Sequence, residues 1–599
     1  MTLNPSPFPP KLLGALLVLC AVVAFLPAIG AGYIWDDNIL LTENPNVRSP
    51  HGPVEIWQGK NSREYTPLST SSFWLEWRLW GDTPTGYHVV NILLHALSAV
   101  LLWQILESLG IPGAWLAALL FAIHPTGVAS VAWVAERKNV LSSALFLGSI
   151  LGFLRSQQRH GNRMYAASIA LFLLAGLSKG SVVTLPVVLA GCLAWMNGKI
   201  TRRDLLRLAP FALIALLVAW FTVRYQMRAD HYSLFPDTVP FRIARAGYAI
   251  CHYLGVIAFP IGLSPMCAQW QPDLHSLAAW LPSIAAVALA VLFFLVRRSW
   301  GRPLLFAYGY FTWMLLPVLG FVWMILQQET PCADWWLYLA APGIFACAGA
   351  GFALTLKGAS KHARVLLQAM LCAVVALLFA QTWRRCAIYG SMETYCRAVL
   401  AENPRLWSMQ NNLGVVLRQR GDLNGAVACY RSALRDNPRF MEARNNLGNA
   451  LAALGNPAAA EGEFRAGLEL HPDNPEILSN LANVCFQQGK VREAFSVMAA
   501  AIKADRANPG LYNQFGLMLA ANKQLDQAVI CFQNALTLSP GDIAVQINLT
   551  RALLATDRRT EAAAVCRKAL QTARKSGNEK LIHLVASLLN QCIQPAEQH

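Results

Sequence analysis

The chain has 599 residues, of which 55% are hydrophobic and only 14% are charged, and its mean hydropathy is +0.38. This composition excludes a set of ordinary soluble domains and favours a membrane protein. The formal charge of +16 would suit a nucleic-acid partner, but no basic stripe with interleaved aromatic residues is present, which argues against nucleic-acid binding. The 14 cysteines form no CxxC pair and no regular framework, and no HExxH or comparable spacing indicates a zinc site.

The first apolar run is long enough to span a bilayer, and similar runs follow it, so we expect a retained helix rather than a cleaved signal. The predicted spans are 11–31, 87–106, 113–126, 139–155, 164–178, 181–198, 207–223, 276–296, 303–326, 336–356 and 363–382. The piece at 245–262 is interrupted by His252, Pro260 and Gly262, and we expect it to be interfacial or re-entrant. The sequence therefore predicts an all-α, polytopic membrane helix bundle of about eleven spans.

Basic residues gather in alternate loops of this bundle. They are Arg155, Arg159 and Arg163; Lys199, Arg202, Arg203 and Arg207; Arg297, Arg298 and Arg302; and Lys357, Lys361 and Arg364. The positive-inside rule places these loops in the cytoplasm. With an odd number of spans, the opening loop and everything after Arg384 then face the periplasm of a bacterial inner membrane, or the lumen of the endoplasmic reticulum in a eukaryote.

A 34-residue repeat begins near Pro404. Its register is kept by Pro404, Pro438, Pro472 and Pro540; by Ala426, Ala460, Ala494, Ala528 and Ala562; and by Leu413, Leu447, Leu481, Phe515 and Leu549. Spacing of this kind is the tetratricopeptide pattern, in which pairs of short helices stack into a solenoid with a concave face. We therefore predict a membrane domain at 1–383 and a repeat domain at 384–599 with about five repeats, the last of them degenerate.

The loops on the predicted external side carry unusual polar residues. The stretch "GYIWDDNILLTENPNV" contains Asp36 and Asp37, and a carboxylate there could deprotonate a hydroxyl acceptor as a phosphate leaving group departs. Arg137, Lys138 and Lys179 could neutralise the developing phosphate charge. The competing interpretation of the two acids is a solvated turn or a helix N-cap. A divalent cation at Asp36 and Asp37 is an open alternative, and the sequence predicts no other metal.

Further polar residues have two interpretations each. His88 and His95 lie seven residues apart on one predicted helix face, where they could line a cavity or simply pack against neighbouring helices. Glu136, Arg137 and Lys138 could orient a ligand or form a solvated interfacial cluster. Lys179 lies between Ser178 and Gly180 in a short loop, which leaves fewer structural explanations for it.

The motifs in their order resemble the transmembrane and tetratricopeptide-repeat-containing O-mannosyltransferases. The segments that carry the resemblance are "WDD" with "NPNV", "YTPLSTSSFWLEW", "GYHVVNILLHAL", "LFAIHPTGVASVAWVAERKNVLS", "LSKGSVVTLPVVL", "LLPVLG" and "ADWWLYL", followed by the repeats. The resemblance implies a C-type glycosyltransferase fold that uses a polyprenyl-phosphate sugar, with mannose as the sugar in eukaryotic members. An Asp of the pair would be the catalytic base of an inverting transfer.

The same resemblance implies that Glu136, Arg137, Lys138 and Lys179 contact the donor. We also expect Asp334, which the motif retains, and His88, on the helix face described above, to belong to the binding site. Relatives commonly show "ADRYxYLP", whereas Trp335 replaces the Arg here. This departure bears on donor identity and on activity.

We therefore expect an integral-membrane glycosyltransferase that transfers a sugar to a hydroxyl of a protein or glycan on the extracytoplasmic side. The repeats would recruit a protein acceptor. One alternative is a membrane-anchored repeat scaffold with an inactive transferase domain. Another is a lipid or solute transporter, which would carry paired ionisable residues at mid-membrane depth rather than near the span ends.

Overall fold

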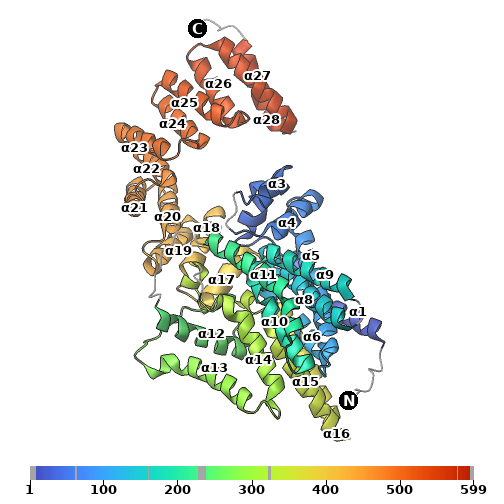
Figure 1. Cartoon of the computed structure of the whole chain (residues 1–599). Helices are drawn as coiled ribbons and strands as arrows, with labels where there is room; N and C mark the ends of the chain where they lie inside the picture. Colours follow the sequence, from blue (N-terminus) through green and yellow to red (C-terminus); the bar gives the residue numbers. More distant parts are fainter. Residues whose placement is uncertain are drawn as a thin grey trace. The chain divides into compact units, whose positions relative to one another are not determined.

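The computed structural model describes residues 9–60, 64–158, 161–226, 238–321, 325–576 and 578–593. It divides into two compact units, Met1–Asn412 and Leu413–His599. The described part of the chain is built from helices (Figure 1), and its β pairing is confined to one isolated antiparallel bridge between Met266 and Ala333. The prediction of an all-α protein is confirmed.

A helix covers most of each predicted span. These helices are α1 (Pro10–Ala24), α5 (Pro84–Ser108), α6 (Ala114–Ile123), α8 (Arg137–Gln158), α9 (Gly161–Ser178), α10 (Leu185–Asn197), α11 (Arg202–Gln226), α13 (Leu277–Leu295), α14 (Gly301–Leu315), α15 (Ala341–Gly358) and α16 (Lys361–Cys386).

By length and composition, six helical segments of the described chain suffice to cross a membrane. The number rises to seven if α6 and the bent continuation through α7 (Val128–Ala132) form one broken span. Helices α1, α9, α14 and α15 have only 15 to 18 residues and do not meet that test. The protein is thus a multi-pass membrane protein, while the count of eleven, and the orientation derived from its parity, remain predictions.

The core of the first unit is a set of helices packed around α5 and α8. Helix α8 contacts α5 and α9, and α5 also contacts α1 and α6. A second row continues from α12 (Val239–Ala258) through α13 and α14 to α15, which packs on α6. Helices α11, α13 and α16 leave most of their apolar side chains uncovered, as expected for surfaces that face lipid.

Short elements fill the connection between α1 and α5. They are the 3-10 turn Leu26–Gly30, the π turn Asn38–Thr42, α2 (Pro45–Arg48), α3 (Gly52–Trp57) and α4 (Pro67–Trp80). Their apolar residues form a small core of their own, made by Leu41, Val47, Phe73, Tyr87 and Val134. This core holds the opening loop, with its two aspartates, against the start of α5 and the turn before α8.

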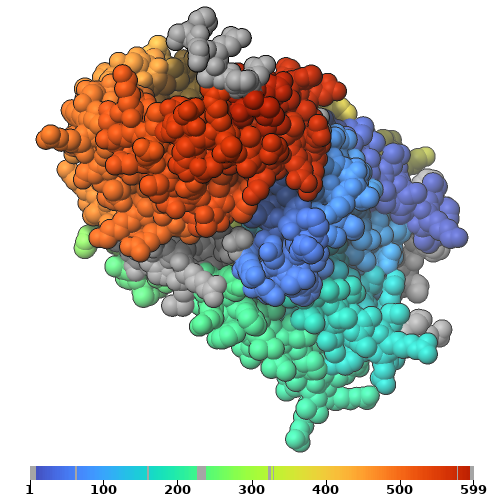
Figure 2. All heavy atoms as spheres, turned by 90° about the horizontal axis from the view of Figure 1, so that it is seen from above, coloured from blue at the N-terminus to red at the C-terminus, as the bar shows by residue number. Residues whose placement is uncertain are grey.

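The repeat region, which begins at the boundary between the units, contains five consecutive helix pairs. They are α18 (Trp407–Gln419) with α19 (Leu423–Asp436), α20 (Met441–Ala453) with α21 (Pro457–Leu470), α22 (Pro475–Gln487) with α23 (Val491–Ala504), α24 (Pro509–Ala521) with α25 (Leu525–Leu538), and α26 (Ile543–Ala555) with α27 (Arg559–Ser576). Helix α28 (Glu579–Ile593) packs on α27. The repeat helices form one continuous surface in Figure 2, from orange to red.

Small residues set the distance between the two helices of a repeat. A Cβ atom added to Gly414 would lie 2.5 Å from the Tyr430 ring, and one added to Gly448 would lie 2.5 Å from the Phe464 ring. Gly516 has the same relation to Phe532, at 2.6 Å. Each glycine therefore leaves room for the aromatic ring of the partner helix, which any larger side chain would displace.

Candidate active site

Asp37 anchors the opening loop. Its side chain is fully buried, and its two carboxyl oxygens accept hydrogen bonds from the backbone N–H of Ile34, at 2.8 Å, and of Ala135, at 2.7 Å. Burial raises the pKa of Asp37 to about 8, against the opposing effect of these two N–H groups. The carboxyl of Asp37 therefore serves to fasten the loop to the turn Val134–Glu136, and water does not reach it.

Asp36 is the accessible member of the pair. It is half-buried, and its charge interacts with that of Lys138. The preceding residue, Trp35, has a backbone φ of +44°, an outlier for a bulky side chain. Its ring stacks on that of Trp133 with centroids 5.3 Å apart and an interplanar angle of 4°. This stack and the Asp37 bonds fix the backbone on both sides of Asp36.

Arg137 is saturated by protein partners. Its guanidinium forms a bidentate ion pair with the Glu76 carboxylate of α4, and the Nη2–Oε2 distance is 3.1 Å. The remaining N–H groups donate to Asn91 Oδ1 at 2.6 Å, to the Tyr87 carbonyl at 3.0 Å and to Ser72 Oγ at 3.3 Å. A guanidinium has five N–H donors, and all five are engaged. Arg137 is only 1% exposed, so it joins α4, α5 and α8 beneath the opening loop.

Two ammonium groups lie beside the Asp36 loop and remain partly exposed. Lys138 Nζ is 3.0 Å from Glu64, whose side chain is 58% exposed, and the pKa of Glu64 is lowered by that ammonium. Lys179 Nζ donates to Asn139 Oδ1 at 2.6 Å and lies 3.7 Å from Glu136 Oε2. That oxygen of Glu136 is buried and accepts no hydrogen bond. Burial lowers the pKa of Lys179, while the charge of Glu136 opposes this.

Asn139 links Lys179 to the segment that contains Trp335. Its Nδ2 donates to the Trp335 carbonyl at 2.7 Å and to Ser130 Oγ at 3.0 Å. The Trp335 ring is 5% exposed and meets the Trp35 and Trp133 rings edge-on. Trp335 thus completes an aromatic cluster behind Asp36.

Asp334 and the histidines are buried supports. Asp334 forms an ion pair with Arg385 of α16, and burial raises the pKa of Asp334. His88 Nε2 lies 3.2 Å from the Ala31 carbonyl, whereas its Nδ1 is buried without a hydrogen-bond partner. His95 Nδ1 lies 2.7 Å from the Tyr338 hydroxyl. Both histidines are fully buried, which favours the packing interpretation of this helix face.

The arrangement of Asp37 bears on the cation that the sequence leaves open. Asp37 is fully buried and each of its carboxyl oxygens accepts one backbone hydrogen bond, while a divalent cation at Asp36 and Asp37 stays an open alternative. Within the described ranges, three or more metal-ligating side chains come close enough to share an ion in two places: His252 with Cys267 and Cys332, and Glu461 with Cys485 and Glu493. Neither group includes Asp36 or Asp37.

The site and the basic loops lie at opposite ends of the same helices. Helix α8 has 22 residues, which corresponds to about 33 Å, and it begins at Arg137 and Lys138. Near its other end, Arg155 donates to Gln104 of α5 at 2.7 Å, and Arg207 of α11 donates to Gln157 at 2.9 Å. This separation matches the thickness of a bilayer core. Arg159, another member of the predicted basic group, lies outside the described residues.

Family models described as tetratricopeptide repeat match residues 393–439, 411–475, 445–509 and 509–542. The repeat prediction is confirmed. Solved repeat proteins resemble the same region. One is MamA of Desulfovibrio magneticus, 23% identical over 28% of this chain and 96% of that chain, with a TM-score of 0.26. Another is a tetratricopeptide-repeat protein of Thermus thermophilus, 25% identical over 31% of this chain and 99% of that chain, with a TM-score of 0.27.

Curated protein O-mannosyl-transferases are similar to part of this chain. A protein O-mannosyl-transferase of Caenorhabditis elegans is 22% identical over 268 residues, which is 41% of this chain and 38% of that protein. The protein O-mannosyl-transferase TMTC4 of Mus musculus is 28% identical over 207 residues, 30% of this chain and 28% of that protein. The chain is a relative of the TMTC-type protein O-mannosyl-transferases. The matched part is at most about two-fifths of the length of these relatives.

Sequence reasoning missed several residues that hold this site together. Glu76, Asn91 and Asn139 interact with predicted site residues, yet none of them was singled out. Asn91 and Asn139 are polar amides inside apolar helical segments, and this is the signal that could have identified them. Glu76 lies in an aromatic-rich stretch, and nothing in its local pattern indicates a buried partner 61 residues away.

Proposed function

We propose that the protein is a membrane glycosyltransferase that transfers a sugar from a polyprenyl-phosphate carrier to a hydroxyl of a protein or glycan acceptor. The proposal places the reaction on the extracytoplasmic side. It is supported by the TMTC-type relatives and by one arrangement above all: the half-buried Asp36 carboxyl interacts with the charge of Lys138, and its loop is bonded to the turn Val134–Glu136, where Lys179 lies 3.7 Å from Glu136 Oε2.

In this proposal Asp36 is the general base. It accepts the proton of the acceptor hydroxyl while the hydroxyl oxygen attacks the anomeric carbon of the sugar. The bond from that carbon to the phosphate oxygen breaks on the opposite side, so a single displacement inverts the configuration. Asp37 is a positioning residue, because its carboxyl is bonded to two backbone N–H groups and is out of reach of an acceptor.

The leaving phosphate takes up negative charge, which Lys138 and Lys179 neutralise. An ammonium has three N–H donors, so Lys179 can keep its bond to Asn139 and still reach a phosphate oxygen. Lys138 can exchange the exposed Glu64 carboxylate for phosphate at little cost. Glu136 is 2% exposed and its Oε2 lies 3.7 Å from Lys179 Nζ, so in this proposal it positions the lysine.

Three of the other predicted donor-binding residues hold the site in place without touching the donor. Arg137, Asp334 and His88 are buried, and each is bonded to other groups of the protein. The Trp335 ring packs in the aromatic cluster and offers no charge to a phosphate. Relatives carry an Arg at position 335, and we propose that Lys138 and Lys179 supply the phosphate contact in this chain.

The test compares exported proteins and glycans by mass spectrometry in a strain that lacks the gene and carries one variant copy. The native chain should restore the missing sugar, and Asp36→Asn should lower transfer by at least about 100-fold, since a general base contributes on that scale. Membrane abundance of the variant is the control for folding. Full transfer by Asp36→Asn would show that Asp36 is not the base.

A further inference from the structure

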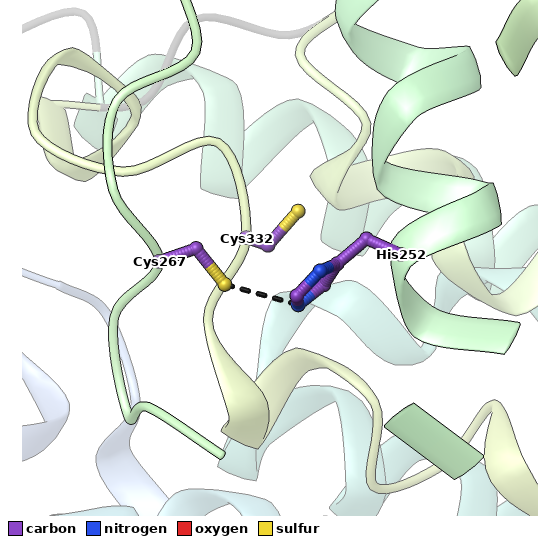
Figure 3. A group of neighbouring side chains, drawn as sticks. All are labelled: His252, Cys267 and Cys332. Carbon is purple, nitrogen blue, oxygen red and sulfur yellow. Dashed lines mark hydrogen bonds between the residues drawn. The ribbon is translucent and has the colours of Figure 1, made fainter. Parts of the chain in front are cut away.

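Three side chains that the proposed transfer does not use converge beside α12. His252 lies on α12, Cys267 lies in the extended segment that follows it, and Cys332 lies just before the turn Asp334–Trp336. One ligand atom from each lies within 4.8 Å of the other two (Figure 3). Cys267 Sγ is 3.0 Å from His252 Nε2, and both cysteines are buried.

The backbone around these side chains is fixed in register. The bridge between Met266 and Ala333 places Cys267 directly opposite Cys332, whose carbonyl accepts from the Cys267 N–H at 3.1 Å. The Tyr253 hydroxyl donates to the Ala333 carbonyl at 3.0 Å and accepts from its N–H at 2.9 Å. Because neighbouring backbone atoms hold both segments, the three side chains form a preorganised group rather than a chance encounter.

The chemistry of the three side chains suits a thiophilic divalent cation. Zinc accepts Cys sulfur at about 2.3 Å and His nitrogen at about 2.0 Å, which places tetrahedral ligand atoms roughly 3.5–3.8 Å apart. The observed 3.0 Å contact needs to lengthen by only about half an ångström to fit.

We propose that His252, Cys267 and Cys332 bind one zinc ion. Two thiolates would neutralise its charge in this buried location, and the fourth position would take a water molecule. Binding would release the protons of both thiols. The ion would hold the segment 332–336 against α12, and that segment carries the Trp335 carbonyl to which Asn139 donates. The zinc therefore positions a support of the candidate active site and takes no part in the transfer.

The test measures zinc in the purified full-length protein by inductively coupled plasma mass spectrometry. We expect about one zinc per chain, lost in Cys267→Ser and in Cys332→Ser. Cys372→Ser is the matched control, because that cysteine is exposed on α16 and should leave the zinc content unchanged.

A second measurement uses the native protein alone and does not depend on how the variants fold. Alkylation followed by peptide mass spectrometry should modify Cys267 and Cys332 only after a chelator removes zinc. Two results would overturn the proposal. One is absence of bound zinc after incubation with Zn²⁺ and gel filtration, and the other is alkylation that requires a reductant, which would identify a disulfide.

Discussion

The membrane unit and the repeat unit are held together by different kinds of contact. In the membrane unit, charged and polar side chains are buried in bonds between segments far apart in the chain, such as Glu76 with Arg137 and Asp334 with Arg385. In the repeat unit, apolar side chains fill the space between adjacent helices, and most of the ion pairs in the described residues include an exposed side chain. The first kind of contact builds a site, and the second builds a repeating surface.

This difference predicts how each unit responds to the loss of one residue. A buried ion pair fails when one partner is removed, because the other charge is left uncompensated in a region without water. A solenoid distributes its stability over neighbouring interfaces, so a single change is felt locally.

The largest effect on stability is expected for Glu76→Ala. The variant leaves the 1%-exposed Arg137 without its carboxylate, and removal of one member of a buried pair costs about 3–5 kcal/mol. Thermal unfolding of the full chain in detergent measures this loss. The control is Glu64→Ala, which removes the exposed partner of Lys138 and should cost no more than about 1 kcal/mol. Equal losses in the two variants would contradict the structural role given to Arg137.

A smaller effect on stability, with a separate effect on the reaction, is expected for Lys179→Met. Loss of the Lys179 ammonium from the leaving phosphate should lower sugar transfer per folded chain by about 10²–10³-fold, and thermal stability should also fall because the buried Glu136 loses its partner. The complemented strain described above provides the measurement. Lys357→Met, at a predicted cytoplasmic loop, is the matched control and should transfer normally. A parallel loss in both variants would point to a general effect of membrane charge.

In the repeat unit, Gly448→Val should cost about 1–3 kcal/mol, because its first added carbon would lie 2.5 Å from the Phe464 ring. Hydrogen exchange of α20 and α21 reports this local loss. Gly462→Ala on α21 is the control, since its added carbon meets no atom within 4 Å, and it should stabilise the helix by about 0.5–1 kcal/mol. Similar destabilisation by both changes would refute the explanation from helix spacing.

The smallest effect is expected for Arg465→Ala, which removes a surface network with Glu461 and Glu493 and should cost about 1 kcal/mol or less. Hydrogen bonds from Lys490 and Arg465 lower the pKa of Glu461 to about 2. Because folding lowers this pKa, the ionised Glu461 carboxylate stabilises the folded protein above about pH 4, and this stabilisation is lost as the pH falls toward 2. Denaturation of both proteins at pH 5 and pH 2.5 should show their stability difference shrinking in acid. A difference that grows in acid would contradict this assignment.

Sequence reasoning succeeded where the determining contacts are local and periodic. The 34-residue spacing of Pro, Ala and Leu predicted five helix pairs, because each position repeats the same neighbour relation. The aromatic partners of Gly414 and Gly448 lie 16 residues later in the same repeat, so they too could have been predicted from the pattern.

The candidate site could be predicted only in outline. The motifs directed attention to Asp36 and Asp37, but nothing local distinguishes two adjacent aspartates. They differ because Asp37 meets the N–H of Ala135, which is 98 residues away. Likewise, His252 and Cys332 reach Cys267 from 15 and 65 positions away along the chain, and no short ligand motif spans such distances. Contacts of this kind depend on tertiary packing that a single sequence does not encode in its local pattern.

The backbone of Trp35 has a consequence for how this protein can evolve. A left-handed backbone at a residue with a large side chain costs on the order of 1–2 kcal/mol, and the stack on Trp133 offsets that cost. Glycine at position 35 would relieve the backbone, but it would leave the Trp133 face uncovered and release the neighbouring Asp36. Positions 35 and 133 should therefore covary among descendants of this sequence, and a lineage that has lost one aromatic ring should have replaced the other as well.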